Sequence, residues 1–473
     1  MACTLEFLVT VGEPQLLRPE TSCPREFKYL SNIDDQIGLR NHIPFVHFYP
    51  PSKVMNDTNS SGNSNSNRSK NIVDVIRMGV SKALVHYYPI AGKLRNGEKG
   101  KLAVDCCGEG VIFREADANV TLEELQRITN NGGLKPPFPQ WEKLLVDDVW
   151  GCNFITDSPL LRMQVTRLAC RGFVLAYTFN HCVCDAYGAL QFVTAVSEFA
   201  RNFNRNAPNT IPSWGRELLK PRNPPIISYP HPEYDLDYSP DAPLSDEPDF
   251  KRLEQTSVFF SKFDVSALKR KINDDKCATF DVIAACLWRA RTKTIIHPET
   301  VTKLLFPVDT RFRYKPELPP GYYGSAVVFP RAATKAKTLV SEPLRYAAGL
   351  ISEVKKGVVG DEYRMSVLDL IEGNGRRGFC RESAFVVSDM SRLRFAEVDF
   401  GWGPAVYGGP ARAGTGHVPG MVTSVIGHKD GERGVEGLLA LVSLPSHALE
   451  LFHEEVRREI SGYDHGVIVA SAL

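Results

Sequence analysis

Ten prolines interrupt the middle of this chain, at positions 208, 212, 221, 224, 225, 230, 232, 240, 243 and 248. Proline lacks a backbone N–H donor and disrupts helices and sheet ladders, so we expect no long regular element in this stretch. A single hydrophobic core stops growing near ~250–300 residues, and the chain has 473 residues. The sequence therefore predicts a crossover linker at residues 203–250, between an N-terminal lobe of residues 1–202 and a C-terminal lobe of residues 251–473.

The clearest element before the linker is a β-hairpin. Residues 163–169 and 173–179 both alternate apolar and polar side chains, and a Cys-Arg-Gly turn separates them. Residues 186–201 then carry apolar side chains at helical spacing, and Asp185 is suited to cap that helix. Further expected elements are strands at 4–12, 43–49, 102–105 and 111–116, a helix at 71–86 and a mobile Asn/Ser-rich surface loop at 56–70.

The part of the chain after the linker also mixes strands and helices. We expect strands at residues 255–263, 303–309 and 438–444, and helices at residues 265–273, 280–292 and 446–460. Because both halves contain both kinds of element, the sequence predicts an α/β fold with two lobes of similar size.

Charge and cysteine content exclude several classes of protein. Lys and Arg number 56 and Asp and Glu 55, so no basic excess would attract nucleic acid. No segment approaches the ~18–20 apolar residues of a membrane span, and the first residues do not resemble a signal peptide. The eleven cysteines show no zinc-site spacing. We therefore expect free thiols in a cytoplasmic protein, with no metal and no membrane partner.

The first candidate for chemistry is His181, which is followed by Asp185 in the sequence Asn-His-Cys-Val-Cys-Asp. The unperturbed pKa of histidine suits proton abstraction near neutral pH. The histidine lies between a predicted strand and a predicted helix, where rigid elements hold a side chain that can still face a cleft. The alternative is a buried histidine satisfied by a backbone carbonyl, with Asp185 only capping the helix. The capping role is compatible with either interpretation.

The second candidate is the segment Asp399-Phe400-Gly401-Trp402-Gly403. Its two glycines indicate a tight backbone path around one large ring, and the residues alone favour a loop with a core tryptophan. The segment 407–410 and the glycines at 414, 416 and 420 extend what we interpret as a flexible stretch. The sequence contains no P-loop, no dinucleotide-binding glycine pattern and no nucleophile elbow.

Both motifs, in this order, resemble those of the plant BAHD acyltransferase family. Other segments are similar to its alcohol acyltransferase branch, and the resemblance covers nearly the whole chain; these segments are residues 24–36, 88–94, 159–161, 164–168 and 321–324. The branch includes benzyl alcohol benzoyltransferases and alkaloid acyltransferases.

The resemblance implies two chloramphenicol-acetyltransferase-like lobes of mixed sheets and helices, with a channel between them. An acyl-CoA and an acyl acceptor would meet in this channel at His181. His181 would be the general base that accepts the proton of the acceptor hydroxyl. The family pattern also implies that Asp185 turns away from the histidine and pairs with an arginine, which Arg311 matches.

The resemblance assigns further roles near the second motif. Asp399 and Gly401 would be structural, and the indole N–H of Trp402 is a possible oxyanion donor. Arg392 matches a basic position beside the cofactor channel, where it would contact a phosphate.

The predicted activity is transfer of an acyl group from acyl-CoA, as co-substrate, to the hydroxyl of a small alcohol or specialised metabolite. We expect a monomer without a tightly bound cofactor. Two alternatives remain open: N-acyl transfer to an amine with the same base, and a non-catalytic ligand-binding relative of the same fold. The chain departs from the family at Ser325, where asparagine is usual, in the Cys-Val-Cys filling of the first motif and in the long segment 56–70. These departures bear on acceptor fit.

Overall fold

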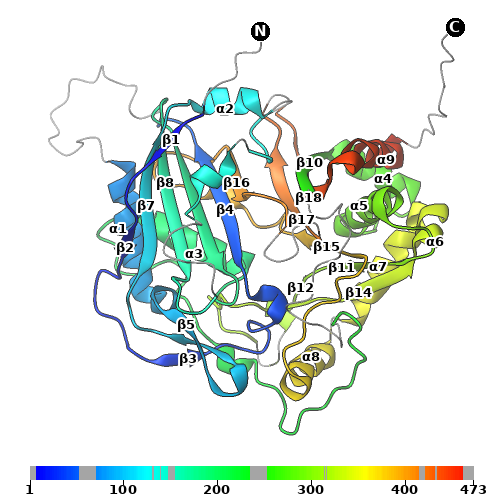
Figure 1. The fold of residues 1–473 in the computed structure, drawn as a ribbon, viewed down its shortest axis with the longest axis horizontal. Helices are drawn as coiled ribbons and strands as arrows, with labels where there is room; N and C mark the ends of the chain where they lie inside the picture. Colours follow the sequence, from blue (N-terminus) through cyan, green and yellow to red (C-terminus); the bar gives the residue numbers. More distant parts are fainter. Residues whose placement is uncertain are drawn as a thin grey trace.

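A computed structural model describes residues 7–52, 71–129, 133–138, 140–146, 155–234, 253–313, 315, 317–358, 360–414, 421–431 and 434–461. The loop predicted at 56–70 and the second half of the predicted linker, 235–250, lie outside these residues. Figure 1 shows two lobes side by side, each with its own sheet.

The N-terminal lobe is built on a seven-stranded mixed sheet. Six of its strands follow one another in the order β1 (Val9–Val11), β7 (Val111–Ala118), β8 (Leu161–Leu168), β9 (Phe173–Asn180), β4 (His42–Tyr49) and β16 (Tyr407–Pro410), while β2 (Gln15–Leu17) also pairs with β7. Strands β8 and β9 form the predicted hairpin. All eight residues of β9 are buried, so both faces of this strand are covered.

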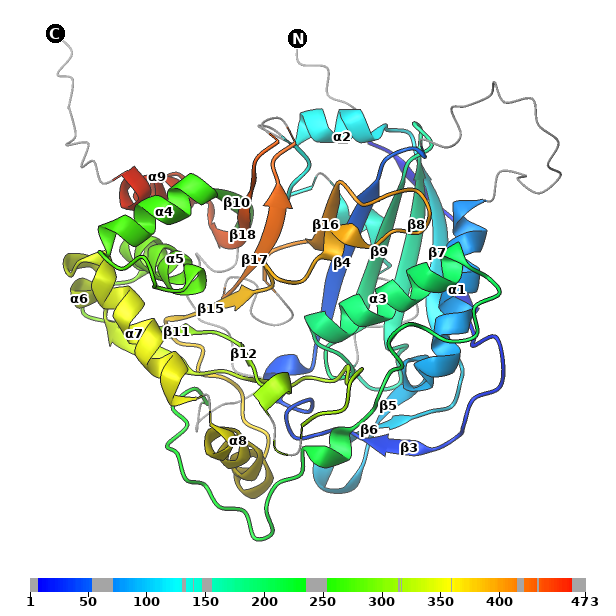
Figure 2. The same ribbon diagram turned by 180° about the vertical axis from the view of Figure 1, so that it is seen from behind.

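Helices α1 (Ile72–His86) and α3 (Ala186–Arg201) pack together against this sheet, as Figure 2 shows. Their apolar sides are buried, as their helical spacing predicts. The two helices approach each other closely at Gly79, where an added Cβ would lie only 2.6 Å from the carbonyl oxygen of Val196. Asn71 caps α1 through its side chain.

The C-terminal lobe is built on a six-stranded sheet. Its order is β10 (Leu253–Ser261), β18 (Glu436–Pro445), β17 (Val422–Lys429), β15 (Ala384–Asp389), β11 (Val301–Leu305) and β14 (Arg331–Lys335). Strands β11, β15 and β17 are parallel neighbours. The helices that pack in this lobe are α4 (Lys262–Lys271), α5 (Thr279–Ile295), α6 (Ala336–Ser341), α7 (Leu344–Gly357) and α9 (Leu449–Ser461).

Side-chain alternation gives this sheet two different faces. Leu304, Phe385 and Val387 belong to the core shared with the helices, where the buried Trp288 donates to Thr302. Leu305 and Val386, one residue away on the same strands, belong to a separate apolar cluster and line a cavity. The sheet therefore separates the core of its lobe from that cavity.

Smaller elements complete the fold. They are the sheet of β3 (Phe27–Tyr29), β6 (Leu102–Asp105) and β5 (Lys93–Asn96), the pair β12 (Val308–Asp309) and β13 (Val327–Val328), and the helices α2 (Leu122–Ile128) and α8 (Asp361–Asn374).

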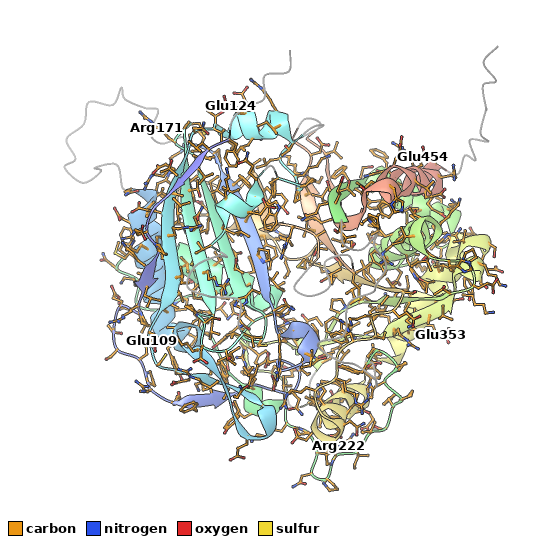
Figure 3. All side chains as sticks on the ribbon, viewed as in Figure 1. Glu109, Glu124, Arg171, Arg222, Glu353 and Glu454 are labelled. Carbon is orange, nitrogen blue, oxygen red and sulfur yellow. The ribbon has the colours of Figure 1, made fainter. Side chains whose placement is uncertain are left out.

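The described part of the crossover, residues 203–234, contains no strand and no α-helix, in agreement with its proline content. It runs along α8, where the carboxylate of Asp369 accepts the backbone N–H of Arg222 at 2.7 Å. The Arg222 side chain, labelled in Figure 3, also pairs with Asp369 and with Glu362. The crossover is thus fixed to the C-terminal lobe by charge-assisted hydrogen bonds.

Strand β16 shows that the two halves of the chain are interleaved. It pairs with β4 of the N-terminal sheet, with Tyr407 opposite Phe48, and Phe395 and Phe400 from the same segment belong to the N-terminal core. The interpretation of residues 407–410 as flexible is wrong, because all four are buried in a strand. A Cβ at Gly408 would lie 2.7 Å from the Phe395 backbone, so glycine is needed for a close approach rather than for mobility.

The prediction of two α/β lobes is confirmed, and the predicted elements occur with shifted ends. One of them is wrong in extent. The strand predicted at 303–309 is divided into β11 and β12, because Pro307 removes a backbone donor in the middle of the run.

Candidate active site

His181 lies directly after β9, at the point where the chain leaves the sheet for α3. Its backbone N–H donates to the carbonyl of Asn41 at 2.8 Å. The side-chain oxygen of Asn180 accepts from the N–H of Cys182 at 3.1 Å, and the backbone carbonyl of Asn180 accepts from the N–H of Val183 at 3.0 Å. These bonds hold the loop in one shape, so the position of the imidazole is set by the backbone of β4 and β9.

Asp185 ends the loop and begins the helix, as its sequence position predicts. One carboxylate oxygen accepts from the N–H of Gly188 at 3.0 Å and caps α3. The other accepts from Arg311 Nη2 at 2.6 Å. An added Cβ at Gly188 would lie 2.0 Å from the Tyr323 carbonyl oxygen, so the first turn of α3 has room only for glycine there.

Arg311 is 4% exposed and lies between the two lobes. It also donates to the Gly324 carbonyl at 2.5 Å and pairs with Asp309 at 3.2 Å. Its guanidinium stacks over the Tyr187 ring with its central carbon 4.6 Å from the ring centroid. The structure thus brings the two sequence-matched residues Asp185 and Arg311 together, with both oxygens of Asp185 engaged away from the imidazole.

A second buried ion pair contacts the same loop and was missed by sequence reasoning. Arg216 Nε lies 3.3 Å from Asp34 Oδ2, and its Nη2 donates to the carbonyl of Val183, inside the first motif. Asp34 also accepts the N–H of Ser325 at 2.8 Å. Arg216 lies in the proline-rich segment that we read only as a linker, so no local pattern distinguished it.

The environment of His181 favours the neutral imidazole. Burial lowers the pKa of His181 below its ordinary value of 6.5. Its own backbone carbonyl and the carboxylates of Asp185 and Asp34 oppose this shift. A neutral imidazole at pH 7 is the form that accepts a proton.

A cavity of about 670 Å³ lies between the lobes and reaches His181. Its floor comes from the parallel strands of the C-terminal sheet. Val386 and Val422 are paired neighbours on β15 and β17, and Ser388 and Ser424 form the next cavity-facing pair. Phe45 of β4 contributes from the opposite lobe. The predicted channel between the lobes is therefore present as a cavity with an apolar and a hydroxyl-bearing part.

Arginine side chains line this cavity. Arg392, predicted from the sequence, is among them, and so are Arg313, Arg381 and Arg412. Arg412 was missed by sequence reasoning; its guanidinium carbon lies 4.9 Å from the centroid of the Trp141 ring. Together they make the cavity suited to an anionic ligand.

The second motif forms a tight turn outside the cavity. Asp399 Oδ1 accepts the N–H groups of Gly401 and Gly403 at 2.7 and 2.8 Å. Both glycines have positive φ, 102° and 92°, a conformation that strains any residue with a Cβ. Phe400 is buried in the N-terminal core. Asp399 and Gly401 therefore hold the shape of this turn, and a structural role for them in the activity stays a prediction.

Trp402 does not reach His181. Its ring packs edge-on against Phe173, with centroids 6.0 Å apart. Phe173 begins β9, whereas His181 follows the other end of that strand; at ~3.3 Å per residue these ends are more than ~20 Å apart. An indole N–H at that distance cannot stabilise an oxyanion beside His181, so the possible oxyanion role of Trp402 is incompatible with the structure.

Two absences concern only the described residues. Within them, His, Cys, Asp and Glu form no group of three or more with the arrangement of a metal site. Likewise, none of the helices in these ranges combines the length and apolar character needed to cross a membrane.

Comparison with known proteins shows which family this chain belongs to. A family model described as the transferase family matches residues 7–458. The chain belongs to the BAHD acyltransferase family. Its similar relatives in this BAHD family include benzyl alcohol O-benzoyltransferase from Petunia hybrida, 44% identical, with 97% of this chain and 95% of that protein covered. The 13-hydroxylupanine O-tigloyltransferase of Lupinus albus is 40% identical over 99% of both chains.

Solved structures support the same fold. Vinorine synthase superposes with a TM-score of 0.67 at 17% identity, covering 96% of this chain and 98% of its own. TRI101 of F. sporotrichioides, complexed with coenzyme A, gives a TM-score of 0.65 at 16% identity, with 89% and 96% covered. The predictions of a BAHD family member, of its two-lobed fold and of an O-acyltransferase are confirmed.

Proposed function

We propose that this BAHD enzyme uses His181 as the general base for acyl transfer from an acyl-CoA to the hydroxyl of a small alcohol or specialised metabolite. The imidazole takes the hydroxyl proton while the oxygen attacks the thioester carbonyl and forms the new C–O bond. The tetrahedral intermediate then collapses, its C–S bond breaks, and the coenzyme A thiolate leaves and receives the proton. One observation carries this proposal: His181, half-buried and with its pKa lowered by desolvation, lines the cavity between the lobes.

Two ion pairs support His181 without sharing its proton. Asp185 is held by Arg311, and Val183 by Arg216, so the loop is fixed at two points after His181. We propose that these residues position the imidazole, and that they account for part of the preorganisation that catalysis needs.

The charged part of the cavity suits the donor. Arg392 and Arg412 would hold phosphate groups of acyl-CoA, and the hydroxyls of Ser388 and Ser424 face the same cavity, where they offer hydrogen bonds to a polar chain. The donor is a co-substrate that leaves as free coenzyme A, so no tightly bound cofactor is required.

Relatives suggest the acceptors to test first. The names of the relatives specify benzyl alcohol with a benzoyl group and 13-hydroxylupanine with a tigloyl group. We propose an uncharged small alcohol as the acceptor of this chain, because arginine side chains line the cavity. We also propose a monomer and a cytoplasmic location, with free acyl-CoA as donor.

The direct test compares His181→Ala with the unaltered protein. Coenzyme A release is measured with acetyl-, benzoyl- and tigloyl-CoA against a panel of alcohols and amines. We expect ester formation to fall ~100–10,000-fold in the variant while coenzyme A binding remains. Cys182→Ala is the matched control one residue away, and it should stay active. Equal activity of His181→Ala, or a trapped acyl-cysteine, would refute the proposed base.

A further inference from the structure

Gly38 and Phe379 form a close contact at one wall of the cavity, and both residues line it. Gly38 lies in the 3₁₀ turn Ile37–Leu39, three residues before Asn41, whose carbonyl accepts the N–H of His181. An added Cβ at Gly38 would lie 2.5 Å from ring atoms Cδ2 and Cε2 of Phe379. The position of the Phe379 ring therefore depends on the absence of a side chain at residue 38.

The Phe379 ring is supported from other sides. Tyr234, at the end of the described crossover, stacks on it with centroids 5.4 Å apart and an interplanar angle of 23°. Phe329 lies against it at 4.6 Å and also lines the cavity. The Tyr234 hydroxyl donates to the side chain of Gln36 at 2.7 Å, so the crossover contacts both Phe379 and the segment just before Gly38.

The crossover itself is held rigidly behind this wall. His231 bonds Glu233 at 2.9 Å through Nδ1 and Ser366 of α8 at 2.7 Å through Nε2. All three residues are at most 2% exposed. The Glu233 carbonyl accepts the N–H of Cys380, next to Phe379, at 2.9 Å. Because this network is buried and bonded, Phe379 cannot move backwards without breaking it.

The surroundings of this wall are apolar. Phe379 packs against the cluster that contains Leu305, Val386 and Met421 on the cavity side of the C-terminal sheet. A phenylalanine ring such as that of Phe379 can pack against an aromatic ring of a bound acceptor. This part of the cavity therefore suits a flat, apolar group.

The charges that line the cavity oppose a cationic acceptor. Asp185 and Asp309 both pair with Arg311, and Asp389 accepts from the Ser391 N–H. Arg313 and Arg381 line the cavity as well. Among the described lining residues, five guanidinium groups outnumber three carboxylates, so the net positive charge would repel an ammonium group.

We propose that Gly38 and Phe379 together determine which acceptors fit, and that they select an uncharged alcohol carrying one aromatic ring or a comparable flat apolar group. This inference rests on the proposed function, because it assigns the acceptor to the cavity that His181 faces. Phe379 sets the depth of the pocket, and Gly38 permits its position.

The test uses kcat/KM for butanol, benzyl alcohol and naphthylmethanol with one acyl-CoA donor. In Gly38→Ala the Phe379 ring must shift into the cavity, so kcat/KM for benzyl alcohol should fall at least about tenfold, with butanol nearly unchanged. Phe379→Leu should raise kcat/KM for naphthylmethanol about tenfold. The double variant with Gly38→Ala and Phe379→Leu should regain the kcat/KM for benzyl alcohol that Gly38→Ala loses. Gly349→Ala, where an added Cβ meets nothing within 4 Å, is the matched control and should behave as the unaltered protein.

Three results would overturn this assignment. Equal losses for butanol and benzyl alcohol in Gly38→Ala would show that the pair does not discriminate by size. If the effect of Gly38→Ala on kcat/KM depended on whether acetyl-CoA or benzoyl-CoA is the donor, the acyl group of the donor would lie at this wall instead. A preference for a cationic alcohol over benzyl alcohol would contradict the charge argument.

A binding measurement separates this inference from the proposed function. Benzyl alcohol should raise the melting temperature of the unaltered protein and of His181→Ala, but not that of Gly38→Ala. If no donor and acceptor pair reacts, the proposed function fails, and this difference in binding still supports the pocket. Equal stabilisation of all three proteins, or of none, contradicts it.

Discussion

Arg311 donates to Asp185 over 2.6 Å and thereby joins the C-terminal half of the chain to the first turn of α3, four residues after His181. The pair is buried, at 4% and 9% side-chain exposure. The second carboxylate oxygen caps α3. Asp185 therefore stabilises the start of the helix, the loop that carries His181 and the contact between the lobes. Both of its oxygens bond groups other than the imidazole, so the contacts of Asp185 are those of a structural residue.

Removing one member of this pair should therefore damage folding and loop order. We expect Asp185→Ala to lose about 3 kcal/mol of unfolding free energy, because α3 loses its cap and the buried Arg311 guanidinium keeps only the more exposed Asp309 as ion-pair partner. Activity per folded molecule should fall together with stability, as seen by denaturant unfolding and turnover on the same preparation. Unchanged stability with lost turnover would point to direct catalysis by Asp185. Arg311→Lys keeps the charge and should lose less than Arg311→Met.

The acid limb of the pH–rate profile should report His181. Burial lowers the pKa of the folded imidazole, so the neutral base persists as the pH falls through 6.5. We expect kcat/KM to stay flat above pH 6.5 and to decline with a midpoint below 6.5. Profiles for the unaltered protein and for Asp34→Asn test this. The negative charge of Asp34 raises the pKa of His181, so its loss in Asp34→Asn should move the midpoint further down. A midpoint above 6.5 would contradict the neutral base.

Two other histidines, the half-buried His42 and the buried His47, should make the fold sensitive to acid. Burial lowers the pKa of His42 and of His47 to about 3. Between pH 6.5 and about 3 the unfolded chain binds these protons and the folded chain does not, so stability must fall as the pH falls through this window. Each histidine contributes up to about 1.4 kcal/mol per pH unit. Urea unfolding across this range should show a shallower slope for His47→Gln, and an equal slope would contradict the assignment.

Arg392 and Arg394 offer a matched test of the donor site. Both are exposed and lie two residues apart, but only Arg392 is among the described residues that line the cavity, while Arg394 pairs with Glu397. Arg392→Ala should raise KM for acyl-CoA about tenfold and weaken its salt dependence, with kcat little changed. Arg394→Ala should leave both constants unaltered. Equal effects of the two variants would show that general surface charge, and not a phosphate contact, is measured.

The second motif should affect stability rather than chemistry. Asp399→Ala leaves the N–H groups of Gly401 and Gly403 without their acceptor, which should cost about 1–3 kcal/mol of unfolding free energy. Trp402→Phe keeps an aromatic ring against Phe173 and removes the indole N–H, so kcat should remain within about threefold of the unaltered value. A loss of ~100-fold in Trp402→Phe would restore the oxyanion role that the geometry excludes.

Local patterns in the sequence were sufficient for the elements and for the centre of the site. The alternation of residues 163–169 and 173–179 predicts the hairpin of β8 and β9, and the apolar spacing after Asp185 predicts α3. Together they place His181 at a strand end before a capped helix. The family resemblance adds Arg311 as the partner of Asp185, a match that no local pattern supplies.

Only the tertiary structure decided which distant segments meet. Arg216 in the crossover contacts Asp34 and Val183, and Gly38 contacts Phe379. Hydrophobic periodicity records which face of an element is buried but not which segment covers it. That choice follows from sheet pairing and lobe packing across hundreds of residues, and these contacts hold the loop that carries the histidine and shape its cavity.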